Sequence, residues 1–131
     1  MCIFCKIINH EIPAKVVYED DDYLAILDIS QVTLGHTIVM PKKHYATVLD
    51  MDSQAFQAYM AVVLKVTKLI QAKTHCLGIN ILNNTNEVAG QTVMHVHYHI
   101  IPRYSKQDNI TINFKENANP NLDEVLKLLN N

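Results

Sequence analysis

The spacing of hydrophobic positions along the chain is strand-like at first, becomes helical in the middle and is then strand-like again. Hydrophobic side chains recur at helical spacing from Ser53 to about Ala72, and Asp52 or Ser53 can cap the start of this helix. Segments with the alternation of strands lie on both sides of it. We predict strands at residues 15–19, 23–27, 36–41 and 78–84, and a last core strand in the histidine-containing segment at residues 91–102. Adjacent strands with one long helix between the third and the fourth favour an α+β domain, an antiparallel sheet with helices packed on one side.

The two ends of the chain have weaker patterns. Residues 3–9 can form a short helix that stops before Pro13. A polar, asparagine-rich segment at residues 106–121 is typical of a loop. One apolar stripe after it predicts a terminal helix with four members, Leu122, Val125, Leu126 and Leu129.

Length and composition indicate a globular protein. The chain has 131 residues, of which 49% are hydrophobic and 18% charged. We expect a single domain over residues 1–131, with a core from about 3 to 103 and a tail from 104 to 131. The net charge of −2 leaves no broad basic surface, which argues against nucleic acid as a partner.

Targeting signals and cysteine usage favour the cytoplasm. The N-terminus lacks the charged start and apolar run of a signal peptide, and no apolar stretch is long enough to cross a membrane. Three cysteines, Cys2, Cys5 and Cys76, fit a compartment in which structural disulfides are rare. We therefore expect a cytoplasmic protein with no membrane partner.

The most informative stretch is "QTVMHVHYHIIP" at residues 91–102, where three histidines occupy every second position. In a strand, His95, His97 and His99 share one face, roughly 6–7 Å apart. The residues between them point to the other face and can be buried in the core; they are Val96, Tyr98 and Ile100.

Three interpretations compete for this pattern. The histidines can be partly buried polar residues without a special role, although strict alternation beside apolar partners disfavours this. They can be metal ligands, since His-x-His is a common ligand spacing. They can also perform nucleophilic or acid–base chemistry on a substrate lying along the strand, because imidazole titrates near neutral pH. The spacing alone does not separate the last two.

The segment "HVHYHII" resembles the His-φ-His-φ-His-φ-φ signature, with φ hydrophobic, of the histidine triad (HIT) family of nucleotide hydrolases and transferases. Residues 3–44 resemble the N-terminal half of its small nucleotide-binding branch, and residues 83–103 resemble the catalytic end. The resemblance implies a five-stranded antiparallel sheet per chain and a homodimer with a continuous ten-stranded sheet. It also implies hydrolysis at the α-phosphorus of nucleoside phosphoramidates or related conjugates, with His97 as the nucleophile.

The resemblance further assigns the residues that bind the substrate. The phosphate is expected to contact the backbone of Gly90 and the side chains of Gln91, Thr92 and His99, with Asn84 in the same site. Thr92 stands where many members carry serine. Two other residues match family positions: Asp28 as the ribose-binding carboxylate and His36 as a histidine that supports the triad. The positions of the base pocket are Ile3, Phe4, Ile7, Ile26 and Ile29. Because hydrophobic walls discriminate poorly between bases, we expect only a modest preference for purine nucleotides.

A metal is predicted at a different set of residues. Cys2 and Cys5 form a C-x₂-C pair, and some family members bind a structural zinc with such a pair, the histidine after "PKK" and the first triad histidine. Here those histidines are His44 and His95, so His95 is expected to be a ligand and not an acid. The alternative is a pair of free thiols. No catalytic metal is expected, since adjacent acidic residues at 20–22 are typical of a solvated turn.

Four other functions compete with the phosphoramidase. A dinucleoside polyphosphate hydrolase is the closest, and assays of both substrates would distinguish the two. A nucleotide-binding regulatory protein would bind tightly with negligible turnover. A metal-dependent hydrolase would place all three histidines on one ion. The uridylyltransferase branch of the family has a different central motif and a longer chain.

Overall fold

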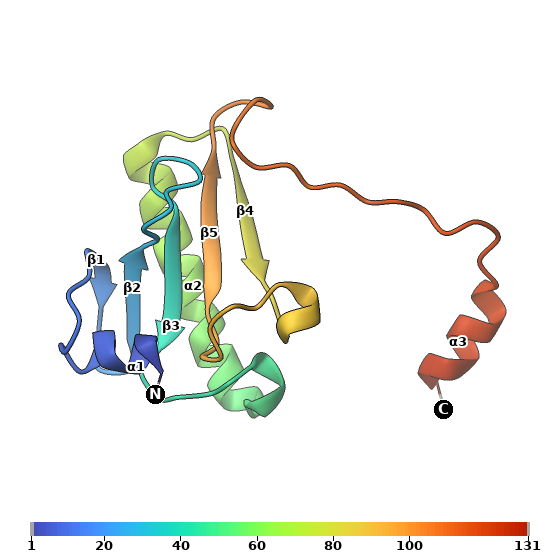
Figure 1. Ribbon diagram of the computed structural model, residues 1–131, viewed down its shortest axis with the longest axis horizontal. Helices are drawn as coiled ribbons and strands as arrows, with labels where there is room; N and C mark the ends of the chain where they lie inside the picture. Colours follow the sequence, from blue (N-terminus) through green and yellow to red (C-terminus); the bar gives the residue numbers. More distant parts are fainter. Residues whose placement is uncertain (1, 131) are drawn as a thin grey trace.

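The computed structural model describes residues 2–130, in which five antiparallel strands form one sheet in the order β1-β2-β3-β5-β4 (Figure 1). This confirms the predicted α+β class. The strands are β1 (Val16–Glu19), β2 (Tyr23–Leu27), β3 (Thr37–Pro41), β4 (Gly78–Asn83) and β5 (Tyr98–Arg103). The helices are α1 (Ile3–Ile8), α2 (Ser53–Thr74) and α3 (Leu122–Asn130), with short 3₁₀ turns at Val48–Asp50 and Glu87–Ala89.

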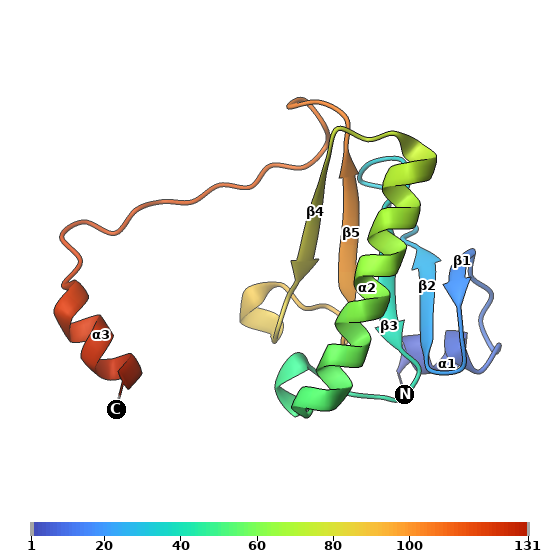
Figure 2. The same ribbon diagram turned by 180° about the vertical axis from the view of Figure 1, so that it is seen from behind.

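Helix α2 lies diagonally across one face of the sheet (Figure 2). It begins where the Asp52 side chain accepts a hydrogen bond from the Ala55 amide at 2.8 Å, and it ends at His75, whose φ of 55° is left-handed. Its buried face supplies Tyr59, Val63, Val66 and Ile70 to the main core. The Tyr59 hydroxyl also donates to the Val39 carbonyl at 2.6 Å, which ties the helix to the centre of the sheet.

The prediction that the helices pack on one side of the sheet is wrong. Helix α1 covers the opposite face from α2, where Phe4 packs in a second core cluster (Figures 1 and 2). The strand members of this cluster are Leu24, Ile26, Ile38 and Met40. The central strands β2 and β3 bury residues on both faces, so both faces require a cover.

The last strand is shorter than predicted, because β5 begins at Tyr98 and includes only His99 of the three histidines. The ladder with β3 ends at the pair Val39–Tyr98, and upstream of it the Val96 amide donates instead to the Tyr45 carbonyl at 2.7 Å. The alternation of faces nevertheless continues upstream of the strand. Val96, Tyr98 and Ile100 pack on the α2 side, as predicted, and the histidines face away from that core.

Strand β4 is an edge strand, and the chain after β5 extends past it to α3 (Figures 1 and 2). Among residues 2–130, no helix combines the length and apolar character needed to cross a bilayer.

Candidate active site and metal group

A pocket of about 800 Å³ opens on the α1 side of the sheet, and its lining is mostly apolar. All five predicted base-pocket residues line it: Ile3, Phe4, Ile7, Ile26 and Ile29. Ile3 is 48% exposed and Ile29 is fully exposed. Large apolar side chains left open beside a concave surface are typical of a ligand site.

The polar residues of the pocket meet at one end of this apolar lining. Asp28, Thr92, His97 and His99 contribute to the lining, and four of the predicted substrate residues are thereby brought together. The rings of His97 and His99 have their centroids 5.1 Å apart, and Phe4 packs edge-on against His97 at 5.0 Å. The arrangement places an apolar slot next to two imidazoles, a carboxylate and a hydroxyl.

One imidazole nitrogen of His97 is held by the backbone. Its Nδ1–H donates to the His95 carbonyl at 2.8 Å, so Nε2 keeps its lone pair. The Asn83 side chain donates to the His97 carbonyl at 3.1 Å and fixes the backbone of the same residue. Burial lowers the pKa of His97, an effect that the hydrogen bond to His95 opposes, and the ring is therefore neutral at pH 7. A neutral imidazole with a free Nε2 is a nucleophile.

His99 receives its orientation from a chain of hydrogen bonds that starts at a backbone amide. The Val32 amide donates to Nδ1 of His36 at 3.4 Å, so His36 carries its proton on Nε2. That Nε2–H donates to Nδ1 of His99 at 2.9 Å. The proton of His99 is consequently on Nε2, where it is available as a donor. Burial and the charges of His97 and His36 lower the pKa of His99 to about 4.

Asp28 lies beside this chain and is itself anchored. Its Oδ1 accepts from the Ser30 amide at 2.8 Å and the Ser30 hydroxyl at 2.6 Å. Its Oδ2 lies 3.7 Å from Nε2 of His36 and 4.0 Å from Nδ1 of His99. Burial raises the pKa of Asp28, but the hydrogen bonds from Ser30 and the two histidines together lower it, so Asp28 is a carboxylate at neutral pH.

Three predicted phosphate residues lie outside the lining of this pocket. The Gln91 side chain is buried and bonded to the backbone, donating to the Ala46 and Val93 carbonyls at 2.8 and 2.9 Å. Asn84 donates to the Gly90 carbonyl at 3.4 Å, and this pair lies in the loop after β4. Gly90 has a φ of 100°, which glycine adopts readily. In this arrangement the Gln91 side chain stabilises the loop between β4 and β5 by these hydrogen bonds.

Sequence reasoning missed a second wall of the pocket. Residues 12–15, between α1 and β1, line it together with Gln31. Gln31 holds the loop before β3 because its Nε2 donates to the Asp28 and His36 carbonyls, both at 2.7 Å. The available signal was the apolar pair Ile12-Pro13 within a loop, because apolar residues outside a strand or helix are not explained by the packing of such an element.

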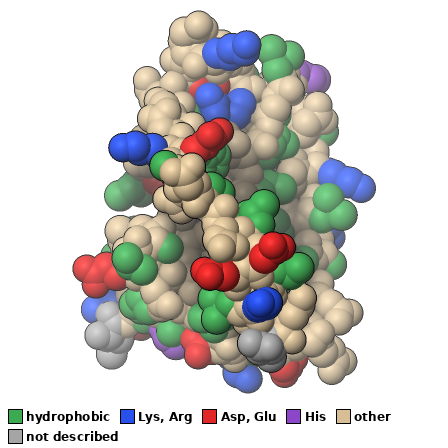
Figure 3. Space-filling model, turned by 90° about the vertical axis from the view of Figure 1, so that its right-hand side faces the viewer, with side chains coloured by type: hydrophobic (Ala, Val, Ile, Leu, Met, Phe, Trp, Pro, Cys, Tyr) green, Lys and Arg blue, Asp and Glu red, His purple; other side chains and the backbone are tan. Residues whose placement is uncertain are grey.

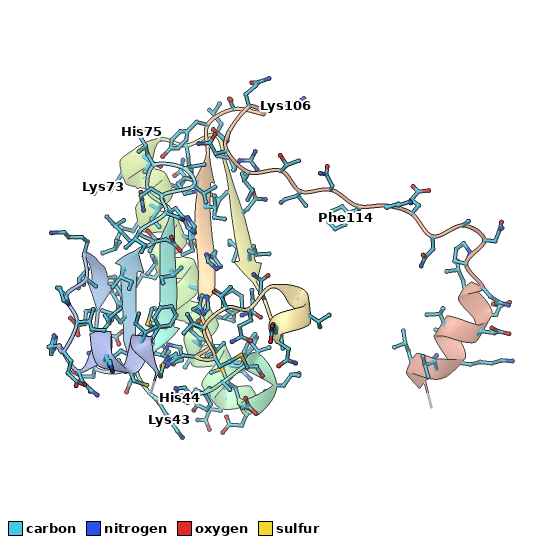
Figure 4. The ribbon with its side chains drawn as sticks, viewed as in Figure 1. Lys43, His44, Lys73, His75, Lys106 and Phe114 are labelled. Carbon is cyan, nitrogen blue, oxygen red and sulfur yellow. The ribbon has the colours of Figure 1, made fainter. Side chains whose placement is uncertain are left out.

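The predicted metal residues also converge, at the other end of the histidine segment. The ligand atoms of Cys2, Cys5, His44 and His95 all lie within 4.8 Å of one another. His44, labelled in Figure 4, follows β3 and lies near the end of the sheet where α1 begins. His95 is fully buried, and its Nε2–H donates to the Pro41 carbonyl at 2.8 Å. Its Nδ1 lone pair therefore points at the thiols.

The spacing of these atoms fits a tetrahedral ion. A zinc with ordinary bond lengths keeps sulfur and nitrogen ligands about 3.5 Å apart and two nitrogens about 3.3 Å apart. The Cys2–His95 and Cys5–His44 contacts are both 3.4 Å, Cys5–His95 is 3.6 Å, and the two Nδ1 atoms are 3.1 Å apart. The Pro41 carbonyl supplies the outer hydrogen bond that orients a metal-bound histidine. The donor set and geometry fit zinc.

The three triad histidines face three different partners. His95 faces the thiols, His97 faces the pocket, and Nδ1 of His99 faces His36. This separation disagrees with a single ion held by all three.

Comparison with known proteins identifies the family. The HIT domain family model matches residues 9–106, three quarters of the chain. The chain belongs to the HIT family. An uncharacterised HIT-like protein of Methanocaldococcus jannaschii is 52% identical to it over 97% of both chains. Crystal structures of HIT family proteins from Bacillus anthracis and Bacillus subtilis are 42% identical, with TM-scores of 0.90. They cover 98% of this chain and 92% and 94% of their own.

Relatives named for an activity are more distant from this HIT protein. An adenosine 5'-monophosphoramidase of Schizosaccharomyces pombe is 38% identical over 81% of this chain and 77% of its own. An adenylylsulfatase of Arabidopsis thaliana is 39% identical over 78% of this chain and 52% of its own. Family membership places the protein among nucleotide-binding hydrolases.

Proposed function

We propose that this HIT protein hydrolyses nucleoside 5'-phosphoramidates and related nucleotide conjugates at the α-phosphorus and releases the nucleoside monophosphate. The observation that carries the proposal is the hydrogen bond from His97 Nδ1 to the His95 carbonyl, which leaves a bare Nε2 in the pocket. The names of the yeast phosphoramidase and the plant adenylylsulfatase support the same substrate class.

The pocket can hold a nucleotide in one orientation. The base lies in the apolar slot lined by Phe4 and Ile26, and the ribose hydroxyls donate to Oδ2 of Asp28, because its Oδ1 is occupied by Ser30. The α-phosphate then reaches His97 and His99. A slot without polar groups aimed at the base edge discriminates weakly, so we expect a modest preference for purines.

The reaction proceeds in two displacements at phosphorus. Nε2 of His97 attacks, the bond from phosphorus to the amine breaks, and the amine leaves with a proton from solvent. Water then attacks the nucleotidyl-histidine, which restores the neutral imidazole and returns that proton to solvent. Negative charge on the phosphate oxygens increases in both steps, and Nε2–H of His99 and the Thr92 hydroxyl are the donors that stabilise it.

The metal and the assembly complete the proposal. Zinc, when bound by Cys2, Cys5, His44 and His95, has a structural role, joining α1 to the histidine segment. His95 is then a ligand, and His97 and His99 perform the chemistry. Two copies pair along the edge strand β4 and α2 to form a homodimer, as the family resemblance implies.

The test is direct detection of the covalent intermediate. Protein mixed with adenosine 5'-phosphoramidate and quenched within milliseconds should carry one AMP on a peptide containing His97, as measured by mass spectrometry. Diadenosine polyphosphate assayed in parallel separates the rival hydrolase, because the larger kcat/KM identifies the preferred leaving group. Turnover without any protein-bound AMP would refute the mechanism.

A further inference from the structure

A second set of possible ligands lies beside the pocket, apart from the metal group that contains the cysteines. One ligand atom from each of Asp28, His36 and His99 lies within 4.8 Å of the other two. Asp28 directly follows β2, His36 directly precedes β3, and His99 is in β5. These three strands are neighbours in the sheet, so the fold brings a carboxylate and two imidazoles together. We refer to these three residues as the second group.

The three ligand atoms surround a point at the distance of a metal bond. Nε2 of His36 is 2.9 Å from Nδ1 of His99. Oδ2 of Asp28 is 3.7 Å from the first nitrogen and 4.0 Å from the second. The circle through these three atoms has a radius of about 2.1 Å, which is the length of bonds from zinc to nitrogen and to carboxylate oxygen. An ion at its centre could contact all three atoms where they lie.

The protonation states of the second group suit a metal. The hydrogen bonds from Ser30 and the neighbouring histidines hold the pKa of Asp28 low against the effect of burial, so that it is a carboxylate. Burial lowers the pKa of His36 and of His99, against the opposing charge of Asp28, so that both rings are neutral at pH 7. Metals bind carboxylates and neutral imidazoles in these forms.

One proton has to move before an ion can bind. His36 carries its proton on Nε2, which donates to His99 at 2.9 Å. Exchange with solvent can transfer that proton to Nδ1, and Nε2 is then free as a ligand. The transfer costs the contact from the Val32 amide, which at 3.4 Å is longer than an ordinary hydrogen bond. The ion then replaces the proton as the link between the two rings.

An ion can reach the second group through the pocket. Asp28 and His99 line the pocket, and His36 is the buried member of the group, at 3% exposed. On the face seen in Figure 3, acidic and basic side chains are interspersed. That face therefore has no acidic patch that would collect cations by charge alone.

We propose that Asp28, His36 and His99 bind a divalent transition-metal ion, such as zinc, and that this ion competes with nucleotides for the pocket. Two nitrogen ligands and one oxygen ligand suit zinc, cobalt and nickel. The competition rests on the proposed function, because the ion occupies Oδ2 of Asp28, the acceptor that we propose for the ribose hydroxyls. An ion in the second group therefore inhibits, whereas the ion proposed for the metal group is structural.

Titration with Co²⁺ of the protein as purified tests the site by a spectrum. Cobalt bound to nitrogen and oxygen has visible d–d absorption, and thiolate ligands add charge-transfer absorption in the near ultraviolet. One equivalent of cobalt should bind without any thiolate charge transfer, and the zinc content should not change. If all bound cobalt shows thiolate charge transfer, or if none binds, the proposal is overturned.

Ligand variants assign the bound cobalt to the second group. Asp28→Asn and His36→Gln should each weaken cobalt binding by at least about tenfold, because each removes a ligand. His75→Asn, which changes an exposed histidine outside the group, is the control and should bind cobalt like the wild type. Because His36 is buried, its replacement also alters the loop before β3. Asp28 is more exposed, with 20% of its side chain accessible, and unchanged cobalt binding by Asp28→Asn would overturn the assignment.

Competition is measured with adenosine, which carries the ribose but has no phosphate to bind the ion in solution. One equivalent of cobalt should raise the dissociation constant of adenosine by about 10–100-fold, as expected for the loss of a charged hydrogen-bond acceptor. Equal affinity with and without cobalt would overturn the competition. Phosphoramidate turnover without added metal reports the proposed function separately. A protein that binds cobalt in the second group but hydrolyses no phosphoramidate would support the site and refute the proposed function.

Discussion

Two histidine clusters at opposite ends of one five-residue segment differ in which ring nitrogen is already occupied. His95 donates Nε2–H to the Pro41 carbonyl and directs Nδ1 at two thiols. His97 donates Nδ1–H to the His95 carbonyl and keeps Nε2 free in an open pocket. The same residue type therefore presents a free ring nitrogen to two thiols in one place and to an open pocket in the other. The backbone carbonyl that accepts from one ring nitrogen determines which nitrogen stays free, and with it the role that we propose for each histidine.

The two clusters are also joined through one residue. The carbonyl that orients His97 belongs to His95, whose ring is held in the metal group. Damage to the pocket cluster should therefore leave the metal group intact, whereas damage to the metal group should reach the pocket only indirectly.

The largest effect is expected when the nucleophile is removed. His97→Ala should lower kcat for adenosine 5'-phosphoramidate by about 10³-fold or more, because no other group can form the covalent intermediate. The affinity for AMP, measured by calorimetry, and the zinc content should stay close to wild type.

The control for this variant is His75→Asn. His75 is an exposed histidine with a left-handed backbone that asparagine also adopts, and it lies outside both clusters. Its activity should equal that of the wild type. Substantial turnover by His97→Ala would remove His97 from the mechanism.

The second effect concerns the metal group. Cys5→Ser removes one of four ligands and should weaken zinc binding by more than the roughly 10–100-fold lost when an outer hydrogen-bond partner is removed. The melting temperature should fall, because zinc no longer joins α1 to the histidine segment. Metal analysis and thermal unfolding, with and without added zinc, provide the measurement.

Cys76→Ala is the matched control, since it removes a thiol that lies outside the metal group. It should keep a full complement of zinc. A wild-type protein purified without chelator that holds far less than one zinc per chain would contradict the assignment. In that case the thiols of Cys2 and Cys5 are free, and the different orientations of His95 and His97 do not arise from a bound metal.

The fold could be predicted from the sequence where local patterns decide it. Helix α2 and strands β1 to β4 have clear spacing, and their bounds agree to within about two residues. The start of β5 depends instead on a contact with the loop after β3, where the Val96 amide donates to the Tyr45 carbonyl. The face covered by α1 depends on where Phe4 finds a cluster between β2 and β3. Both are contacts between distant parts of the chain, which a local pattern does not contain.

For the candidate site, too, some features could be predicted from the sequence and others depend on tertiary contacts. Resemblance to the family named the apolar slot, Asp28 and the two pocket histidines, and the structure brings these together. It did not identify the wall at residues 12–15, because apolar residues in a loop have no period to recognise. Nor did it show that Gln91 turns inward, because its partner Ala46 lies 45 residues away. Hydrogen-bond partners of side chains are set by tertiary structure.

The third effect concerns ribose recognition. Asp28→Ala removes a charged acceptor, worth about 1.5–3 kcal/mol, and should raise KM for nucleotides by about 10–100-fold. Asp21→Ala, in the exposed turn between β1 and β2, is the matched control and should leave KM unchanged. An unchanged KM for Asp28→Ala would show that the ribose contact is misassigned.

The smallest effect is the part of the pH dependence of stability that His99 of the pocket cluster contributes. An unfolded histidine has a pKa of about 6.5, whereas burial and the neighbouring imidazoles hold the pKa of His99 at about 4. Between these values the unfolded chain binds a proton that the folded protein does not. The contribution of His99 to the unfolding free energy should therefore be constant above about pH 6.5 and should be lost as the pH falls towards 4.

The contribution of His99 should be about 1–2 kcal/mol between pH 6.5 and 5, and urea unfolding at these pH values measures it. His99→Gln keeps a polar side chain but cannot titrate, so it should lose less stability than the wild type over this range. Release of zinc at low pH affects both proteins equally and cancels in the difference. Parallel plots of unfolding free energy against pH for the two proteins would show that the surroundings do not hold His99 neutral. The contact with His36 would then no longer be evidence that the proton of His99 is on Nε2.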